Sequence, residues 1–177
     1  MTRRTTMLVV LFGSLVVTGC TKYKVTQPLS EPIDRAAACT IGQLEDRLPP
    51  DTEDEDKPPL EDIDKFAGYL RAELEKRNIF AQINTWDSEA EYEINGAILT
   101  YRRGSGAVRF LIGFGLGNAE VTVELHLRNR TTGATLFSGN FKRNVSSGME
   151  SGIEMYKRIA KDFAKELDKQ LKQIEKG

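Results

Sequence analysis

The sequence predicts an α+β fold, in which a largely antiparallel sheet of about five or six strands carries two amphipathic helices packed on one face. Three patterns indicate this fold. Apolar and polar residues alternate over 119–129, apolar residues recur every three or four positions over 61–77 and 150–174, and a Thr131-Thr132-Gly133 turn follows the alternating segment. A period of two is typical of a half-buried strand, and a spacing of three and four is typical of an amphipathic helix.

The domain is predicted to begin with a strand and a helix. Small and apolar residues from about Ala37 to Leu44 predict the strand. The helix over 61–77 has one apolar stripe, formed by Ile63, Phe66, Ala67, Leu70 and Leu74. Acidic residues crowd its first turn and basic residues its last, an arrangement that complements the helix dipole.

Four further strands and a second helix complete the predicted domain. The strands are expected over Phe80–Trp86, Tyr92–Arg102, Ala119–Asn129 and Thr135–Ser146, and the last two form a hairpin around the Thr-Gly turn. The final helix, from about Glu150 to Ile174, carries a single apolar stripe. The order β-α-β-β-(β)-β-β-α favours a largely antiparallel sheet with both helices on one face.

Residues 48–60 predict an exposed loop between the first strand and the first helix. The pairs Pro49-Pro50 and Pro58-Pro59 flank an acidic run, and proline blocks both helices and central strands. A calcium loop of the EF-hand type needs a glycine at its sharp turn, and this segment has none. A solvated loop is the favoured interpretation, and weak cation binding is the alternative.

Residues 1–19 predict a secretory signal peptide. Arg3 and Arg4 precede an apolar run from Met7 to Val17, which is too short to span a bilayer, since that needs roughly 20 apolar residues. The residues Val17-Thr18-Gly19-Cys20 resemble the bacterial lipobox, which implies cleavage before Cys20 and lipidation of its sulfur. The acyl chains would contribute about 0.8 kcal/mol per buried methylene to membrane binding. An ordinary signal with a chance cysteine is the alternative.

Residues 20–35 predict the lipidated cysteine and a tether, and residues 36–177 a single α/β domain. The tether contains Pro28, Pro32 and few apolar residues, and fifteen extended residues reach at most roughly 50 Å. Cys39 lies in a small apolar segment and has no partner in the chain if Cys20 carries lipid. A buried inert thiol is expected there, with an intermolecular disulfide or a catalytic thiol as the alternatives.

Charge and residue types exclude several functions. Loss of Arg3 and Arg4 with the signal leaves 23 Lys and Arg against 26 Asp and Glu, and this mild acidity argues against a nucleic-acid partner. His126, the only histidine, falls on the polar face of its strand between Glu124 and Arg128. No partners for a catalytic triad or a zinc site are recognisable in the sequence. We therefore expect no enzyme, no cofactor and no metal.

Residues 102–118 are the most unusual segment, with five glycines and three arginines around an apolar centre. The segment fits neither a phosphate loop nor a dinucleotide fingerprint, because the required glycine spacing and the Gly-Lys-Ser/Thr are absent. Two interpretations stay open: a strand and bend packed under the C-terminal helix, or a docking surface. The candidate partner-binding residues are Arg109, Phe110, Ile112, Phe114 and Leu116.

Four features of this half of the chain belong together: Arg109, the glycines from 113 to 117, the strand from Glu120 to Leu127 and the Thr-Gly turn. With these features the sequence resembles an uncharacterised bacterial lipoprotein family, domain of unknown function four-four-one-zero. The resemblance covers about Ala36 to Leu171. It implies an envelope lipoprotein with a compact α/β domain, and it brings no known catalytic residues. The acidic loop departs from the family pattern.

The predicted function is a non-enzymatic, lipid-anchored envelope module that contacts the membrane through Cys20 and another envelope protein or component through the glycine-rich segment. Thr21 stands where the common inner-membrane retention signal of lipoproteins has Asp, which implies the outer membrane, facing the periplasm. The alternative is a periplasmic carrier or sensor of a small ligand, with a groove near Arg109 and the glycines. The oligomeric state is left open.

Overall fold

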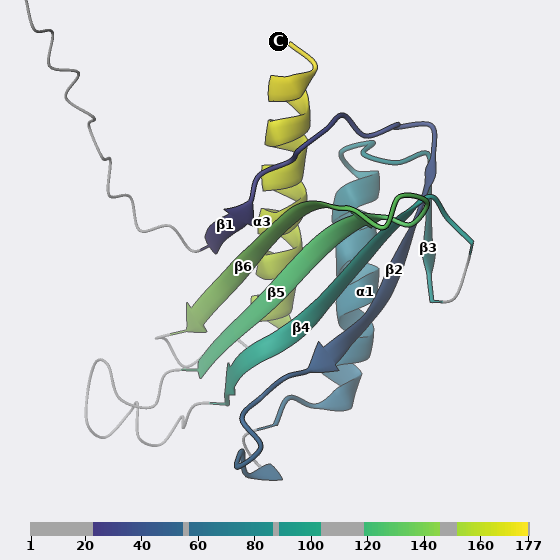
Figure 1. Cartoon of the computed structure of the whole chain (residues 1–177). Coiled ribbons are helices and arrows are strands. Elements are labelled where there is room, and N and C mark those ends of the chain that lie inside the picture. The colour runs from purple at the N-terminus through teal and green to yellow at the C-terminus, as the bar shows by residue number, and fades with distance from the viewer. Residues whose placement is uncertain (1–22, 55–56, 87–88, 104–118, 146–151, 177) are drawn as a thin grey trace, which may run out of the picture.

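The computed structural model describes residues 23–54, 57–86, 89–103, 119–145 and 152–176. Within them, the chain forms one mixed sheet of six strands, and both helices cover the same face of it (Figure 1). The elements in chain order are β1 Tyr23–Gln27, β2 Ala38–Asp46, α1 Leu60–Glu75, β3 Gln82–Thr85, β4 Tyr92–Arg102, β5 Ala119–Asn129, β6 Thr135–Val145 and α3 Gly152–Ile174.

The sheet is mainly antiparallel, as predicted, and its strand order is β1-β6-β5-β4-β2-β3. The strands β4, β5 and β6 are antiparallel neighbours, and β1 pairs antiparallel with β6. The prediction was incomplete for β2, which runs parallel to both of its neighbours, β3 and β4. The helix α1 connects β2 to β3, and two adjacent parallel strands require a crossover of this kind.

The segment predicted as a tether belongs in large part to the domain, so that prediction is wrong for its described residues. Residues 23–27 form the edge strand β1, with Tyr23 opposite Phe141 in β6. Further along, Leu29 and Ile33 are buried. The physical reason is that β1 lies at the edge of the sheet, where one neighbour pairs with half of its backbone groups and the other half can face solvent. A strand in this position needs few apolar residues, so its sequence resembles a tether.

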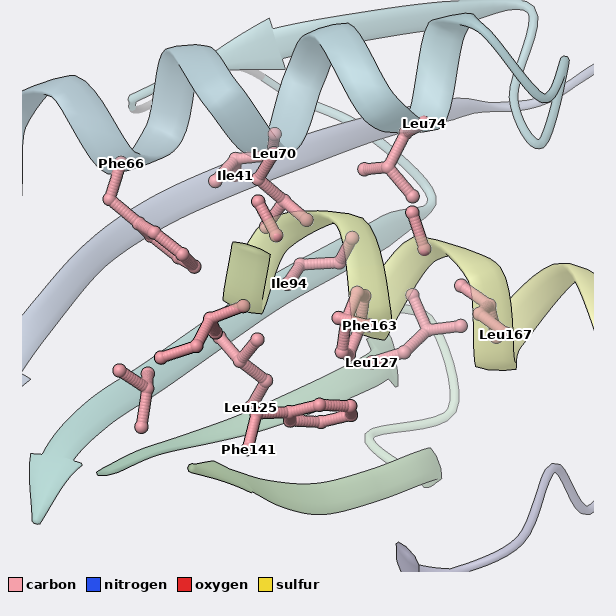
Figure 2. Packing of buried hydrophobic residues seen from close by; sticks show 14 of the residues in the cluster. Ile41, Phe66, Leu70, Leu74, Ile94, Leu125, Leu127, Phe141, Phe163 and Leu167 are labelled. Atoms are coloured by element: carbon pink, nitrogen blue, oxygen red, sulfur yellow. The ribbon is translucent and has the colours of Figure 1, made fainter. Parts of the chain in front are cut away.

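The hydrophobic core lies between the sheet and the two helices (Figure 2). The predicted stripe of α1 is buried in full, and Tyr156, Phe163 and Leu167 of α3 have no exposed surface. The inward side chains of β5 alternate with outward ones, as the period-two pattern predicted. The buried residues of β5 that face the helices are Val121, Val123, Leu125 and Leu127.

Gly96 of β4 lies too close to β5 for a residue with a Cβ atom. A Cβ atom at this position would lie 2.4 Å from the backbone oxygen of Glu124 and 2.7 Å from Cδ2 of Leu125. Because the first of these neighbours is backbone, it cannot move aside without disturbing the ladder. A glycine is therefore required where β4 passes β5.

Cys39 is buried, as the sequence predicted, and the described residues of the acidic loop up to Pro59 lie outside the α-helices and strands. The Cys39 side chain in β2 has no exposed surface, and burial raises the pKa of its thiol, so the group stays in its unreactive protonated form. Residues 48–54 and 57–59 form no α-helix or strand, and the Asp54 side chain is 96% exposed.

Among the described residues no helix is both long and apolar enough to cross a membrane.

Candidate functional site

The residues that the sequence singles out for lipidation and docking lie outside the described parts of the chain. They are Cys20 and the candidate contacts Arg109, Phe110, Ile112, Phe114 and Leu116. Their positions along the chain are nevertheless fixed by their neighbours. Cys20 precedes β1 by two intervening residues, and the glycine-rich segment connects Arg102 at the end of β4 to Ala119 at the start of β5.

The face of the sheet away from the helices is polar. The strand β5 presents Glu120, Glu124 and His126 on this face. Lys142 pairs with Glu120 at 2.7 Å, and Nε2 of His126 lies 3.2 Å from Oε2 of Glu124. The His126 side chain is 34% exposed, so it lies at the surface as expected. Ion pairs at a protein surface, such as that of Lys142 with Glu120, contribute only about 0–1 kcal/mol. The polar face is therefore a solvated surface.

A small pocket opens at one side of this polar face, where β2, the end of β3, β4 and the turn after β5 come together. Its volume is about 190 Å³, and we call it the Trp86 pocket. Outward residues of β2 and β4 form part of it, since the alternate residues Cys39, Ile41 and Ile94 point into the core. The lining residues are Thr40, Gly42, Gln43, Trp86, Glu93 and Arg130.

Trp86 adopts a backbone conformation that is uncommon for a side chain of its size. Its φ is 61°, in the left-handed region that non-glycine residues seldom enter. Its backbone N–H donates to the carbonyl oxygen of Ile41 at 3.1 Å, which continues the pairing of β2 with β3 by one residue. A strained residue costs about 1–3 kcal/mol and persists only where its surroundings fix it. Trp86 as a residue is 41% exposed.

Gly42, one of the lining residues, leaves room for a neighbouring side chain at this pocket. A Cβ atom at position 42 would lie 2.1 Å from Oδ1 of Asn95, so the Asn95 side chain occupies the space that any other residue would fill. The sequence gives no signal for this pocket. Its residues come from four separate segments, and Trp86 falls at the end of a predicted strand as one more aromatic residue.

The N-terminal segment is held firmly against α3. The Tyr23 hydroxyl donates to Oε2 of Glu166 at 2.9 Å, and the backbone N–H of Leu29 donates to Oε1 of Gln170 at 2.6 Å. The Tyr23 ring stacks on Phe141 with centroids 5.4 Å apart. The strand β1 is therefore fixed to the domain by contacts on both β6 and α3.

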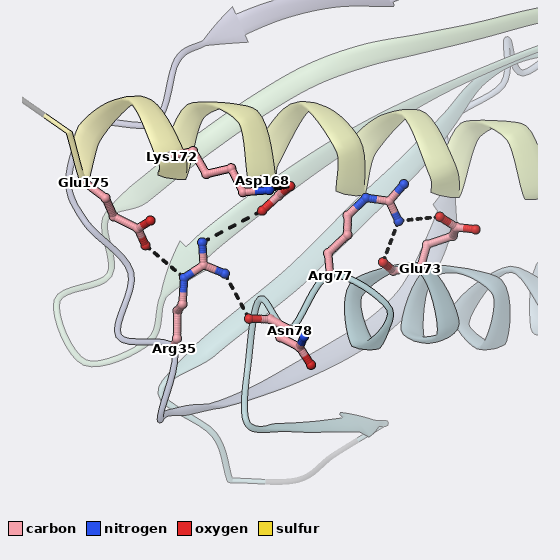
Figure 3. Close-up of polar contacts among 7 residues, drawn as sticks. All are labelled: Arg35, Glu73, Arg77, Asn78, Asp168, Lys172 and Glu175. Carbon is pink, nitrogen blue, oxygen red and sulfur yellow. Dashed lines mark hydrogen bonds and ion pairs between the residues drawn. The ribbon is translucent and has the colours of Figure 1, made fainter.

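Arg35 also attaches the N-terminal segment to the rest of the domain (Figure 3). Its Nε donates to Oε1 of Glu175 at 2.9 Å, and its Nη1 donates to the carbonyl oxygen of Asn78 at 2.9 Å. Its Nη2 lies 3.8 Å from Oδ1 of Asp168. One arginine thus joins the chain before β2 to the end of α3 and to the turn after α1.

Because Tyr23 and Glu166 are both titratable, we expect the free energy of unfolding to depend on pH through their contact. Burial raises the pKa of Glu166, but hydrogen bonds from Gln170, Tyr23 and Lys169 outweigh it and leave the pKa below its ordinary value of 4.5. A lowered carboxylate pKa stabilises the fold above the unfolded value and loses that contribution as the pH falls through the folded value. Burial and the Glu166 contact raise the pKa of Tyr23 to about 12, so its contribution is lost as the pH rises from 10 towards 12.

Urea unfolding of the wild type and of Glu166→Gln between pH 7 and pH 3 measures this dependence. We expect the gap in unfolding free energy between the two proteins to narrow as the pH falls. A gap that stays constant across this range would show that the carboxylate charge does not stabilise the attachment of β1. Lys165→Gln, exposed on the same helix, is the matched control.

Three comparisons place the chain among known proteins. The model of the family described as Domain of unknown function (DUF4410) matches residues 23–146. The structure of the PelC dodecamer from Paraburkholderia phytofirmans is similar, with a TM-score of 0.56 and 15% identity over 82% of this chain and 97% of that chain. Protein XCC0632 from Xanthomonas campestris has a TM-score of 0.53 and 11% identity over 87% of this chain and 95% of that chain. At these identities the likeness is one of fold. No curated protein matches the sequence.

Proposed function

The chain belongs to the DUF4410 family, as the resemblance in its sequence predicted, and we propose that it is a lipid-anchored module of the bacterial cell envelope that binds another envelope component without catalysis. The anchor is the lipid on Cys20, and the destination is the outer membrane with the domain on the periplasmic side. The observation that carries the proposal is the position of β1, which begins three residues after Cys20.

The short connection holds the domain close to its membrane. Three extended residues span at most about 10 Å, and β1 is attached to β6 and α3 rather than free to extend. The side of the domain formed by β1 therefore faces the lipid. This arrangement replaces the long tether that the sequence predicted.

The same arrangement brings the end of the sheet where β4 ends and β5 begins towards the membrane side. Tyr23 pairs with Phe141, four residues before the end of β6 at Val145, and Val145 pairs with Ala119 at the start of β5. At about 3.4 Å per residue, the start of β1 lies within about 14 Å of this end of the sheet. We propose that Arg109, Phe110, Ile112, Phe114 and Leu116, in the connection that begins there, contact a partner in or at the membrane.

The alternative function, a carrier with a groove near the glycine-rich segment, needs an internal cavity between helices and sheet. In the described part of the chain this layer is occupied by large buried side chains, among them Phe66, Tyr156 and Phe163. A filled layer of this kind counts against a carrier and favours a module that binds at its surface.

The experiment that tests the proposal is photocrosslinking in cells from a photoreactive residue at position 114, with position 161 on the exposed face of α3 as the control. A discrete adduct from position 114 alone would support the docking surface and identify the partner by its mass. An adduct at the mass of two copies would mean self-assembly, as in the dodecameric PelC structure. Equal results from both positions would remove the basis for a docking site.

A Cys20→Ser variant, secreted behind an ordinary cleavable signal in place of residues 1–19, tests the anchor separately. We expect the wild type in the membrane fraction and the variant in the soluble periplasmic fraction, because two or more acyl chains are needed for stable attachment. A variant that stays membrane-bound, while still folded by circular dichroism, would show that attachment does not depend on the lipid.

A further inference from the structure

The Trp86 pocket has one aromatic side chain among its lining residues, on a backbone that is already held in place. The hydrogen bond from the Trp86 backbone N–H to the carbonyl oxygen of Ile41 holds the left-handed backbone in place. Trp86 as a residue is 41% exposed, and it lines the pocket. Thr40 and Arg130 each interact within the protein as well. A binding surface that is already ordered loses little conformational freedom when a ligand binds.

The polar residues of the pocket offer hydrogen bonds of both kinds. Glu93 accepts, Arg130 donates, and Thr40 and Gln43 can do either. One acidic and one basic residue line the pocket, so their formal charges balance. A ligand with a net charge would meet one favourable and one unfavourable residue, whereas a neutral ligand with several hydroxyl groups can bond to both.

The size of the pocket limits the ligand to a single ring. Its volume of about 190 Å³ is below the roughly 300–1,000 Å³ of sites that take drug-sized molecules. The pocket opens on the polar face of the sheet, so a chain of linked rings could continue outside it.

We propose that the Trp86 pocket binds one uncharged, hydroxyl-bearing pyranose ring, the repeating unit of a neutral glycan. The C–H face of the ring stacks on the indole, and its hydroxyl groups bond to Glu93, Gln43 and Arg130. The apolar platform with a few placed polar groups is the usual composition of a small-molecule site. The proposal is independent of the lipid anchor and of the glycine-rich segment.

The chain offers a direct probe of this pocket, because Trp86 is its only tryptophan. The mature chain, purified in detergent, is titrated with N-acetylglucosamine and with its linear trimer while the tryptophan emission is recorded. We expect a saturable change in emission with both saccharides. Glu93→Gln should weaken binding about tenfold, the effect of losing one hydrogen bond to a charged group. Glu120→Gln, on the same face outside the pocket, should leave the affinity unchanged.

Several outcomes would overturn the proposal. An emission that changes only linearly with saccharide would mean that no site is filled. Saturation by L-lysine or acetate in place of the saccharide would assign the pocket to a charged ligand. Equal affinity in Glu93→Gln and the wild type, both folded by circular dichroism, would place the saccharide elsewhere. None of these results depends on whether Cys20 or position 114 behaves as proposed above.

Discussion

Replacing Phe163 by alanine is expected to lower the free energy of unfolding by about 3–5 kcal/mol, the usual range for removing a buried phenylalanine side chain. Phe163 lies on α3 with no exposed surface. Its ring packs edge-to-face against Phe137 and against Phe141 of β6, with centroids 5.5 Å apart in each pair. The substitution therefore removes both the buried apolar area and two aromatic contacts that join α3 to the sheet.

Urea unfolding followed by circular dichroism measures this effect. Lys161→Ala, an exposed position on the same helix, should change the unfolding free energy by no more than about 0.5 kcal/mol. A Phe163→Ala loss below about 1 kcal/mol would mean that the layer between α3 and β6 is not the tightly packed core described above.

The strands in the middle of the chain could be predicted closely from sequence. The bounds of β4 and β5 coincide with the prediction, and β6 differs by one residue. The reason is that one face of each strand is buried under a helix, so the apolar residues must alternate along the strand. The stripes of both helices were predicted for the same reason, since each helix packs one face on the core.

Strand direction and the edge strand were not predictable in the same way. Alternation reports which residues are buried, but it is the same for parallel and antiparallel neighbours, so the parallel pairing of β2 was missed. The strand β1 has five residues, and the prolines at 28 and 32 suggested a tether. The position of β1 depends on contacts between residues far apart in the sequence, such as Tyr23 and Glu166. A local sequence pattern cannot predict such contacts.

The candidate site was less predictable than the fold. The predicted lipidation signal is local and rests on four adjacent residues, Val17-Thr18-Gly19-Cys20. The Trp86 pocket could not, because it depends on a positive φ at a tryptophan and on a glycine that admits the Asn95 side chain. A tryptophan in a sequence does not predict a positive φ, which is expected at glycine or asparagine. A glycine in a strand does not show which neighbouring side chain fills the space beside it.

Replacing Asp162 by alanine is expected to destabilise the fold by about 3–5 kcal/mol, because it leaves the charge of Arg143 buried without its partner. Arg143 lies on the inward face of β6, opposite Val121 of β5, and its side chain is 10% exposed. Its guanidinium pairs with the carboxylate of Asp162 on α3. Urea unfolding at pH 7 gives the change in unfolding free energy.

A double replacement separates the cost of an unpaired charge from the worth of the pair itself. Taking two charges out of water costs several kcal/mol per ion, so a buried pair often contributes little compared with apolar side chains of similar volume. We therefore expect Arg143→Met combined with Asp162→Leu to unfold within about 1 kcal/mol of the wild type, far above Asp162→Ala. A double variant as unstable as the single one would show that the pair itself, and not the unpaired arginine, holds α3 to β6.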